Sequence, residues 1–208
     1  MTADDFSQAT KAILTNHGQT LLEIAARGIQ YGLENAKPRP VSPDDVSPEL
    51  AAPGASFVTL KRNGNLRGCI GSSQAYRPLA ADVSENAFRA AFKDPRFPPL
   101  KPEEIDELGL SVSLLSPQAP MTFSGEDEFM QSLRPNRDGL IIEDNGRRAL
   151  FLPSVWAQLP DTKSFVEHLK TKAGLAKDHW SDTFKAWRFT AEEIYADALD
   201  DPASIWGN

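Results

Sequence analysis

The 208-residue chain has few of the side chains that most often hold metals or form cross-links: one cysteine and three histidines. A single cysteine excludes an internal disulfide, and the scattered histidines show no spacing typical of a metal site. Acidic residues outnumber basic ones by 29 to 22, and the net charge is −7. Since no basic stripe is present, we expect no nucleic-acid partner and no bound metal.

Long apolar runs are also missing. No stretch approaches the roughly 20 apolar residues of a membrane span. The acidic start, residues 1–5, lacks the apolar core of a signal peptide. Residues 64–68 superficially suggest a glycine-rich phosphate loop, but they lie in a predicted hairpin rather than before a helix. These absences indicate a cytoplasmic protein with no membrane association and no cofactor.

The single cysteine lies in residues 65–72, NLRGCIGS. Residues 56–61 are rich in β-branched and aromatic side chains, and Asn63-Gly64 after them is the strongest short signal for a two-residue hairpin. Because side chains alternate along a strand, the returning strand has two predicted faces. The core face holds Leu66, Gly68 and Ile70, and the opposite face holds Arg67, Cys69 and Gly71.

On that opposite face, Arg67 and Cys69 would lie roughly 7 Å apart along the strand. A guanidinium so close favours the thiolate, which is the nucleophilic form of cysteine. Cys69 is therefore a candidate nucleophile, and Arg67 a candidate stabiliser of the thiolate or of an anion. Gly68, Gly71 and Ser72 are candidate binding residues, since glycine lets a ligand or another backbone approach closely. The alternative is that Cys69 is a small buried hydrophobic residue.

A second unusual run, residues 94–99 (DPRFPP), follows a predicted helix over residues 79–93. Prolines on both sides fix the backbone of Arg96 and Phe97. In one interpretation the run is a rigid connector with Phe97 buried. In the other, Arg96 faces the same cleft as Arg67 and binds an anion. Asp94 and Arg96 are therefore further candidate binding residues.

Hairpins and helices alternate without a repeated strand–helix–strand pattern, which indicates an α+β fold with a largely antiparallel sheet and flanking helices. Two subdomains that form a cleft are expected, and the cleft is the default ligand site. The proline-rich residues 37–54 suit no element and are interpreted as a surface loop. Beyond the first hairpin, the expected elements are helices over 16–35, 126–133 and 162–173, strands over 108–115 and 184–189, and a second Asn-Gly hairpin over 139–152.

Residues 66–72 resemble the signature of the AMMECR-type domain, whose bacterial and archaeal members include AmmeMemoRadiSam system protein A. The resemblance covers roughly residues 16–198, with 1–15 as a flexible N-terminus and 199–208 as an acidic, frayed tail. It continues through Arg77-Pro78-Leu79, Asn86-Ala87, Ala90-Ala91, Asp94-Pro95-Arg96-Phe97, residues 111–117, Phe151-Leu152-Pro153 and Lys172-Ala173-Gly174-Leu175.

This resemblance implies an α+β fold of two packed subdomains, with the Arg-Gly-Cys-Ile-Gly segment near the cleft between them. It also implies Memo-like and radical SAM proteins as partners in a shared modification pathway. It supplies no established reaction.

Two hypotheses about function follow. In the first, Arg67 lowers the pKa of Cys69, the thiolate attacks an electrophile, and Arg67 or Arg96 holds an anionic group of the substrate. No histidine lies near Cys69 in the sequence to act as its base. In the second, the cleft binds a small molecule or a peptide, and Cys69 is structural. The sequence does not decide the oligomeric state. In a homodimer, Trp206 near the tail would be one contact.

Overall fold

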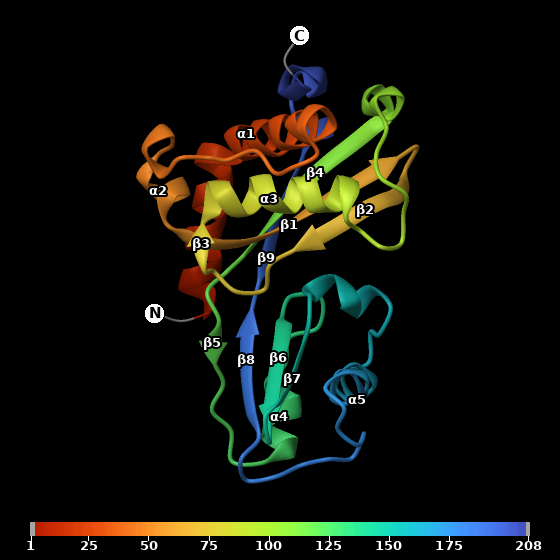
Figure 1. Cartoon of the computed structure of the whole chain (residues 1–208). Helices are drawn as coiled ribbons and strands as arrows, with labels where there is room; N and C mark the ends of the chain where they lie inside the picture. The colour runs from red at the N-terminus through yellow and green to blue at the C-terminus, as the bar shows by residue number, and fades with distance from the viewer. Residues whose placement is uncertain (1–2, 207–208) are drawn as a thin grey trace. The chain divides into compact units, whose positions relative to one another are not determined.

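The computed structural model describes residues 3–206, and the chain divides into two compact units. Unit 1 comprises residues up to Ala9 and Ser116–Ala191, and unit 2 comprises Thr10–Leu115 and the residues from Glu192 onward. Each unit has an antiparallel sheet with helices beside it (Figure 1), which confirms the predicted α+β fold. The cleft expected between two subdomains stays a prediction.

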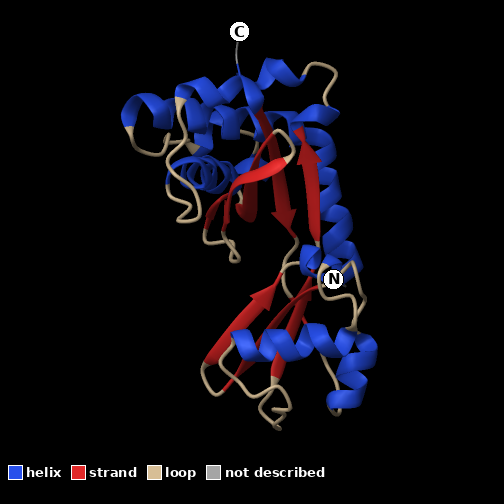
Figure 2. Cartoon of the chain, turned by 90° about the vertical axis from the view of Figure 1, so that its right-hand side faces the viewer, coloured by secondary structure: helices blue, strands red, loops and turns tan. Residues whose placement is uncertain are grey.

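The sheet of unit 2 has five strands in the order β2-β1-β4-β9, and β3 pairs with the start of β1. Helices α1 (Ala3–Asn35) and α3 (Leu79–Phe92) pack on one face of this sheet (Figure 2). The strands are β1 (Pro53–Arg62), β2 (Asn65–Gly71), β3 (Arg77–Pro78), β4 (Leu108–Leu115) and β9 (Ala191–Tyr195). The β1–β2 hairpin confirms the Asn-Gly prediction, since Asn63 and Gly64 have φ of 51° and 78°.

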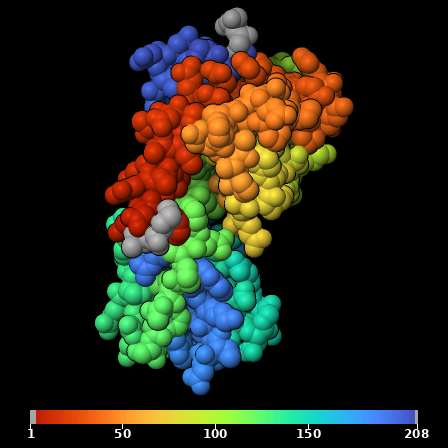
Figure 3. Space-filling model, turned by 90° about the vertical axis from the view of Figure 1, so that its left-hand side faces the viewer, coloured from red at the N-terminus to blue at the C-terminus, as the bar shows by residue number. Residues whose placement is uncertain are grey.

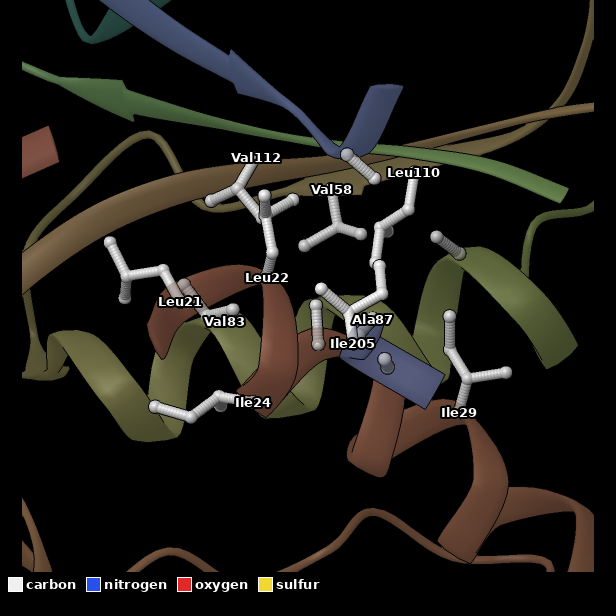
Figure 4. Close-up of a cluster of buried hydrophobic side chains, with 14 of the residues drawn as sticks. Leu21, Leu22, Ile24, Ile29, Val58, Val83, Ala87, Leu110, Val112 and Ile205 are labelled. Atoms are coloured by element: carbon white, nitrogen blue, oxygen red, sulfur yellow. The ribbon is translucent and has the colours of Figure 1, made fainter. Parts of the chain in front are cut away.

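The core of unit 2 lies between these two helices and the sheet. Figure 4 shows Leu22 of α1, Val83 of α3 and Val58 of β1 in this cluster, and each is fully buried. Ile205 joins them and is 1% exposed. It lies in a 3₁₀ helix, Pro202–Trp206, so the prediction of a frayed tail is wrong. Leu199 and Trp206 also pack against this core, and Gln30 of α1 donates to the Trp206 carbonyl at 2.6 Å, so several contacts dock the tail.

The N-terminal prediction is also wrong, because α1 begins at Ala3 rather than at residue 16. Asp4 and Asp5 occupy its first turn, where carboxylates interact favourably with the helix dipole. Asp4 accepts hydrogen bonds from Arg134 and Arg137, both in unit 1. No helix within residues 3–206, this long one included, is long and apolar enough to cross a membrane.

The proline-rich segment 37–54 contains more structure than the sequence analysis predicted. Pro43–Asp45 form a 3₁₀ helix and Pro48–Ala51 form α2, with a proline at the start of each. Leu50 of α2 is buried in the core of unit 2. In Figure 3 part of this segment (orange) lies at the surface beside α1 (red).

Unit 1 has a four-stranded sheet in the order β5-β8-β6-β7, and its core surrounds Trp156 and Phe165. Its strands are β5 (Ala119–Pro120), β6 (Gly139–Asp144), β7 (Arg147–Phe151) and β8 (Lys185–Phe189), and its helices are α4 (Glu126–Ser132) and α5 (Thr162–Lys172). The second Asn-Gly hairpin is confirmed in β6–β7. The sequence analysis ended the sheets with β8 and missed β9.

Candidate functional site

A β-bulge at Arg67 determines how the NLRGCIGS segment presents its side chains. Leu60 of β1 lies opposite Gly68, and Lys61 lies opposite Leu66, so Arg67 is the extra residue. The bulge interrupts the alternation of faces that the sequence predicted. Leu66 is therefore 42% exposed rather than part of the core.

Arg67 is buried and bound to a carboxylate from another element. Its Nε donates to Glu104 Oε1 at 2.7 Å, and its Nη2 donates to Oε2 at 3.0 Å. Glu104 lies in a 3₁₀ helix, Pro102–Glu107, and the hydrogen bonds from Arg67 lower the pKa of Glu104 to about 2. The guanidinium of Arg67 is thus bound to Glu104 and not to Cys69. The predicted role of Arg67 as a stabiliser of the Cys69 thiolate has no support from these contacts.

Cys69 is half-buried on the side of the sheet away from α3. It lies opposite Thr59, whose Oγ1 donates to Sγ at 3.3 Å. Its backbone N–H donates to Asp94 Oδ2 at 2.9 Å, and its carbonyl accepts from Arg96 Nη2 at 3.2 Å. Because β2 is an edge strand, Asp94 and Arg96 satisfy backbone groups that would otherwise face an open edge.

Asp94 also holds Arg96 in place. Arg96 donates from Nε to Oδ1 at 2.9 Å and from Nη2 to Oδ2 at 2.7 Å. These hydrogen bonds hold the pKa of the Asp94 carboxyl well below its usual range. The Arg96 side chain is 53% exposed, and Nη1 makes no hydrogen bond within residues 3–206. A preorganised guanidinium with a free donor thus lies beside the cysteine.

Three further candidate binding residues have structural explanations. A Cβ at Gly68 would overlap the carbonyl oxygen of Ala90 in α3, so the glycine permits close helix–strand packing. A Cβ at Gly71 would overlap the ring of Phe57. Ser72 is buried and donates to Asp82 Oδ1 at 2.7 Å.

Asp82 is the centre of a buried polar network that ties α3 to the strands. The backbone N–H and hydroxyl of Ser56 donate to its Oδ2, and Arg77 Nε donates to its Oδ1 at 2.8 Å. Asn86 Nδ2 also donates to Oδ2 at 2.9 Å. Ser72 therefore positions the end of β2 and is not available to a ligand.

A row of polar side chains continues from Cys69 across the sheet of unit 2. Thr59 lies opposite Ser111 of β4, whose Oγ donates to Glu193 Oε1 of β9 at 2.7 Å. The Tyr195 hydroxyl donates to Glu193 Oε2 at 2.6 Å, and this hydrogen bond raises the pKa of Tyr195 to about 12. Neither Thr59 nor Glu193 was predicted from the sequence. No local signal marks either residue, because their proximity depends on strand pairing.

The three histidines contact other groups. His17 Nε2 lies 3.6 Å from Glu49 Oε2, His168 Nδ1 lies 2.8 Å from the Ser164 carbonyl, and His179 Nε2 lies 2.5 Å from Asp144 Oδ2. None of the three histidines is therefore paired with Cys69. Within the described part of the chain, no group of three or more histidine, cysteine, aspartate and glutamate side chains could hold a metal ion.

Proteins of similar sequence are found in archaea. An uncharacterized relative from Methanothermobacter thermautotrophicus is 37% identical over 184 residues, which cover 88% of this chain and 95% of the relative. A relative from Thermococcus gammatolerans is 39% identical over 184 residues, covering 84% of this chain and 88% of the relative.

A solved structure is also similar. The crystal structure of an uncharacterized protein from Pyrococcus horikoshii matches with a TM-score of 0.74 at 35% identity, over 86% of this chain and 90% of that one. The model of the AMMECR1 family matches residues 22–194, which include both units' sheets almost completely. The chain therefore belongs to the AMMECR1 family.

Proposed function

We propose that this protein binds a small anionic molecule at Cys69 and Arg96, and that the Cys69 thiolate attacks an electrophilic centre of that molecule. The observation that carries the proposal is the Arg96 guanidinium, which Asp94 fixes in place while its Nη1 makes no hydrogen bond to any described residue. Such a group can hold a carboxylate or phosphate without first losing conformational freedom.

The surroundings of Sγ support the nucleophilic role. The hydroxyl of Thr59 donates to the sulfur, and the Arg96 guanidinium, held by Asp94, donates to the carbonyl of the same cysteine. No histidine is placed to accept the thiol proton, so the proton would pass to solvent before the attack. The sulfur would then add to an electrophilic carbonyl carbon of the substrate, the C–O π bond would break, and its electron pair would stay on the substrate oxygen and take a proton from solvent.

We place this chemistry in the cytoplasm, in a modification pathway shared with Memo-like and radical SAM proteins. The support for the pathway is family membership, and the support for the compartment is the lone, unpaired cysteine.

The proposal predicts that Cys69 reacts in the folded protein. Iodoacetamide should alkylate Cys69 at pH 7 without denaturant, and intact mass measures the rate. Arg96→Gln should slow the reaction, because it removes the guanidinium beside the cysteine. Arg27→Gln on α1, an exposed arginine paired with Glu23, is the matched control and should leave the rate unchanged.

Protection of the thiol tests the binding step. Inorganic phosphate or succinate should slow the alkylation of wild-type protein but have little effect on the Arg96→Gln variant. Failure of iodoacetamide to alkylate the folded wild-type protein, or alkylation that neither anion slows, would contradict the proposal.

The second candidate function is a non-catalytic binding or adaptor module. It is favoured by the observation that Gly68, Gly71 and Ser72 are all explained by packing. If Cys69 reacts only after denaturation and Cys69→Ser retains ligand or partner binding, this second function holds instead.

A further inference from the structure

We infer that unit 2 has a second anion-binding site, built around Arg67 and separate from Cys69. The first observation is the bulge in β2. Bulges commonly re-aim a side chain next to a functional site, and here the extra residue is the arginine itself. Its guanidinium lies against Glu104 in the 3₁₀ helix Pro102–Glu107.

The second observation is an unpartnered donor. Arg67 is 8% exposed, and its Nε and Nη2 donate to Glu104. Its Nη1 is buried and has no hydrogen-bond partner among the described residues. Buried polar groups nearly always have partners, so this NH₂ group calls for an acceptor that the chain itself does not provide.

The third observation is a hollow of about 450 Å³ with Arg67 in its wall. The lining residues are Arg62, Arg67, Pro98, Pro99, Lys101, Glu103 and Glu104. Arg62 is paired with Glu107 and Arg67 with Glu104, so Lys101 is the cation of the lining that has no ion pair among the described residues. Both carboxylate oxygens of Glu104 already accept hydrogen bonds, from Arg67 and from the Lys101 backbone N–H. Glu104 therefore does not compete with a ligand anion for the remaining donors.

These features define the chemistry of the ligand. A guanidinium NH₂ group and the exposed ammonium of Lys101 suit an oxyanion, either a carboxylate or a phosphate, on a small molecule. The adjacent Pro98 and Pro99 rings supply a rigid apolar wall for the rest of that molecule. Neither Cys69 nor Arg96 lines the hollow, so the inference does not depend on the proposed function.

Calorimetric titration of the full chain with inorganic phosphate, and separately with succinate, tests the inference and tells a phosphate site from a carboxylate site. Saturable binding of at least one anion is expected. Lys101→Ala should weaken it by roughly three- to tenfold. Lys37→Ala removes the same charge from an exposed lysine outside the hollow, and it should leave the affinity unchanged.

Arg67→Lys is the second variant, because it keeps the positive charge beside Glu104 but removes Nη1. If it folds, it should lose the anion binding that Lys101→Ala weakens, and if it does not, the Lys101→Ala comparison decides. Absence of saturable binding in the wild type would overturn the inference. So would binding that survives Lys101→Ala but is lost in Arg96→Gln, since the anion would then occupy the Cys69 site.

Discussion

At the scale of single residues, Arg67 shows how backbone position decides chemical role. Its neighbours in sequence suggested a partner two residues away, but the bulge turned the guanidinium to Glu104, 37 residues along the chain. Both charges are buried, so each depends on the other. Removing one partner of such a pair is costly, because the remaining charge stays buried without compensation.

Glu104→Gln should therefore lower the free energy of unfolding at pH 7 by about 3–5 kcal/mol. The pKa of Glu104 falls from its ordinary 4.5 to about 2 in the folded state, so its contribution is complete above pH 4.5 and is lost as the pH falls toward 2. The difference between the wild type and the variant should shrink over that interval. Urea unfolding at a series of pH values measures this.

The matched control is Glu107→Gln, which removes the more exposed partner of Arg62. An exposed ion pair contributes little, so this variant should lose less than about 1 kcal/mol at pH 7. If both variants lose the same free energy of unfolding, the buried Arg67–Glu104 pair contributes no more to stability than the exposed Arg62–Glu107 pair.

At the scale of elements, two sheet edges are closed by side chains instead of strands. Asp94 and Arg96 bind the outward N–H and carbonyl of Cys69 in β2. In β7, the edge of the other sheet, Lys172 Nζ donates to the Leu150 carbonyl at 2.9 Å. Both arrangements occupy backbone groups that could otherwise pair with another chain.

The packing of α3 on β2 also depends on a single position. Gly68→Ala should lower the free energy of unfolding by about 1–3 kcal/mol, because its Cβ would overlap the Ala90 carbonyl and force the helix away. Gly109→Ala, in β4 of the same sheet, is the control. Its Cβ would lie 3.8 Å from the nearest atoms of Lys61, an ordinary contact, so no loss is expected. Urea denaturation of both variants decides between a local packing requirement and a general intolerance of alanine in this sheet.

At the scale of the whole molecule, the chain builds two hydrophobic cores. The larger lies in unit 2 among α1, α3 and the five-stranded sheet, and the smaller lies in unit 1 around Trp156. In the smaller core, Trp156 and Phe165 are stacked with ring centroids 3.7 Å apart. Trp156 therefore reports on one core and not on the other.

Phe165→Ala should cost about 3–5 kcal/mol and change the native tryptophan emission, because it opens a cavity against Trp156. Leu22→Ala in the larger core should cost about 2–5 kcal/mol, and in a Trp206→Phe background, which removes the tryptophan packed on that core, it should leave the native emission unchanged. Fluorescence before and through denaturation measures both. Equal spectral changes in the two variants would contradict the description of two separate cores.

The sequence by itself determined the local structure. Both Asn-Gly hairpins were predictable, because the turn needs positive φ at two successive residues and few residues adopt it readily. The start of α5 at its Asp161 cap was also predictable, since the carboxylate accepts the Ser164 N–H one turn later. The NLRGCIGS segment also indicated the family. Each of these signals acts between residues close together in the chain.

Only the tertiary structure decided which groups meet. The Glu104 partner of Arg67 and the docking of Ile205 join segments distant in sequence. The bulge at Arg67 and the burial of Ser72 against Asp82 depend on strand register and on packing of α3. Strand register and burial depend on the combined packing of such segments, and no local preference encodes them. For that reason the sequence located the candidate site at Cys69, while the fold showed that Arg67 pairs with Glu104 and that Arg96 donates to the Cys69 carbonyl.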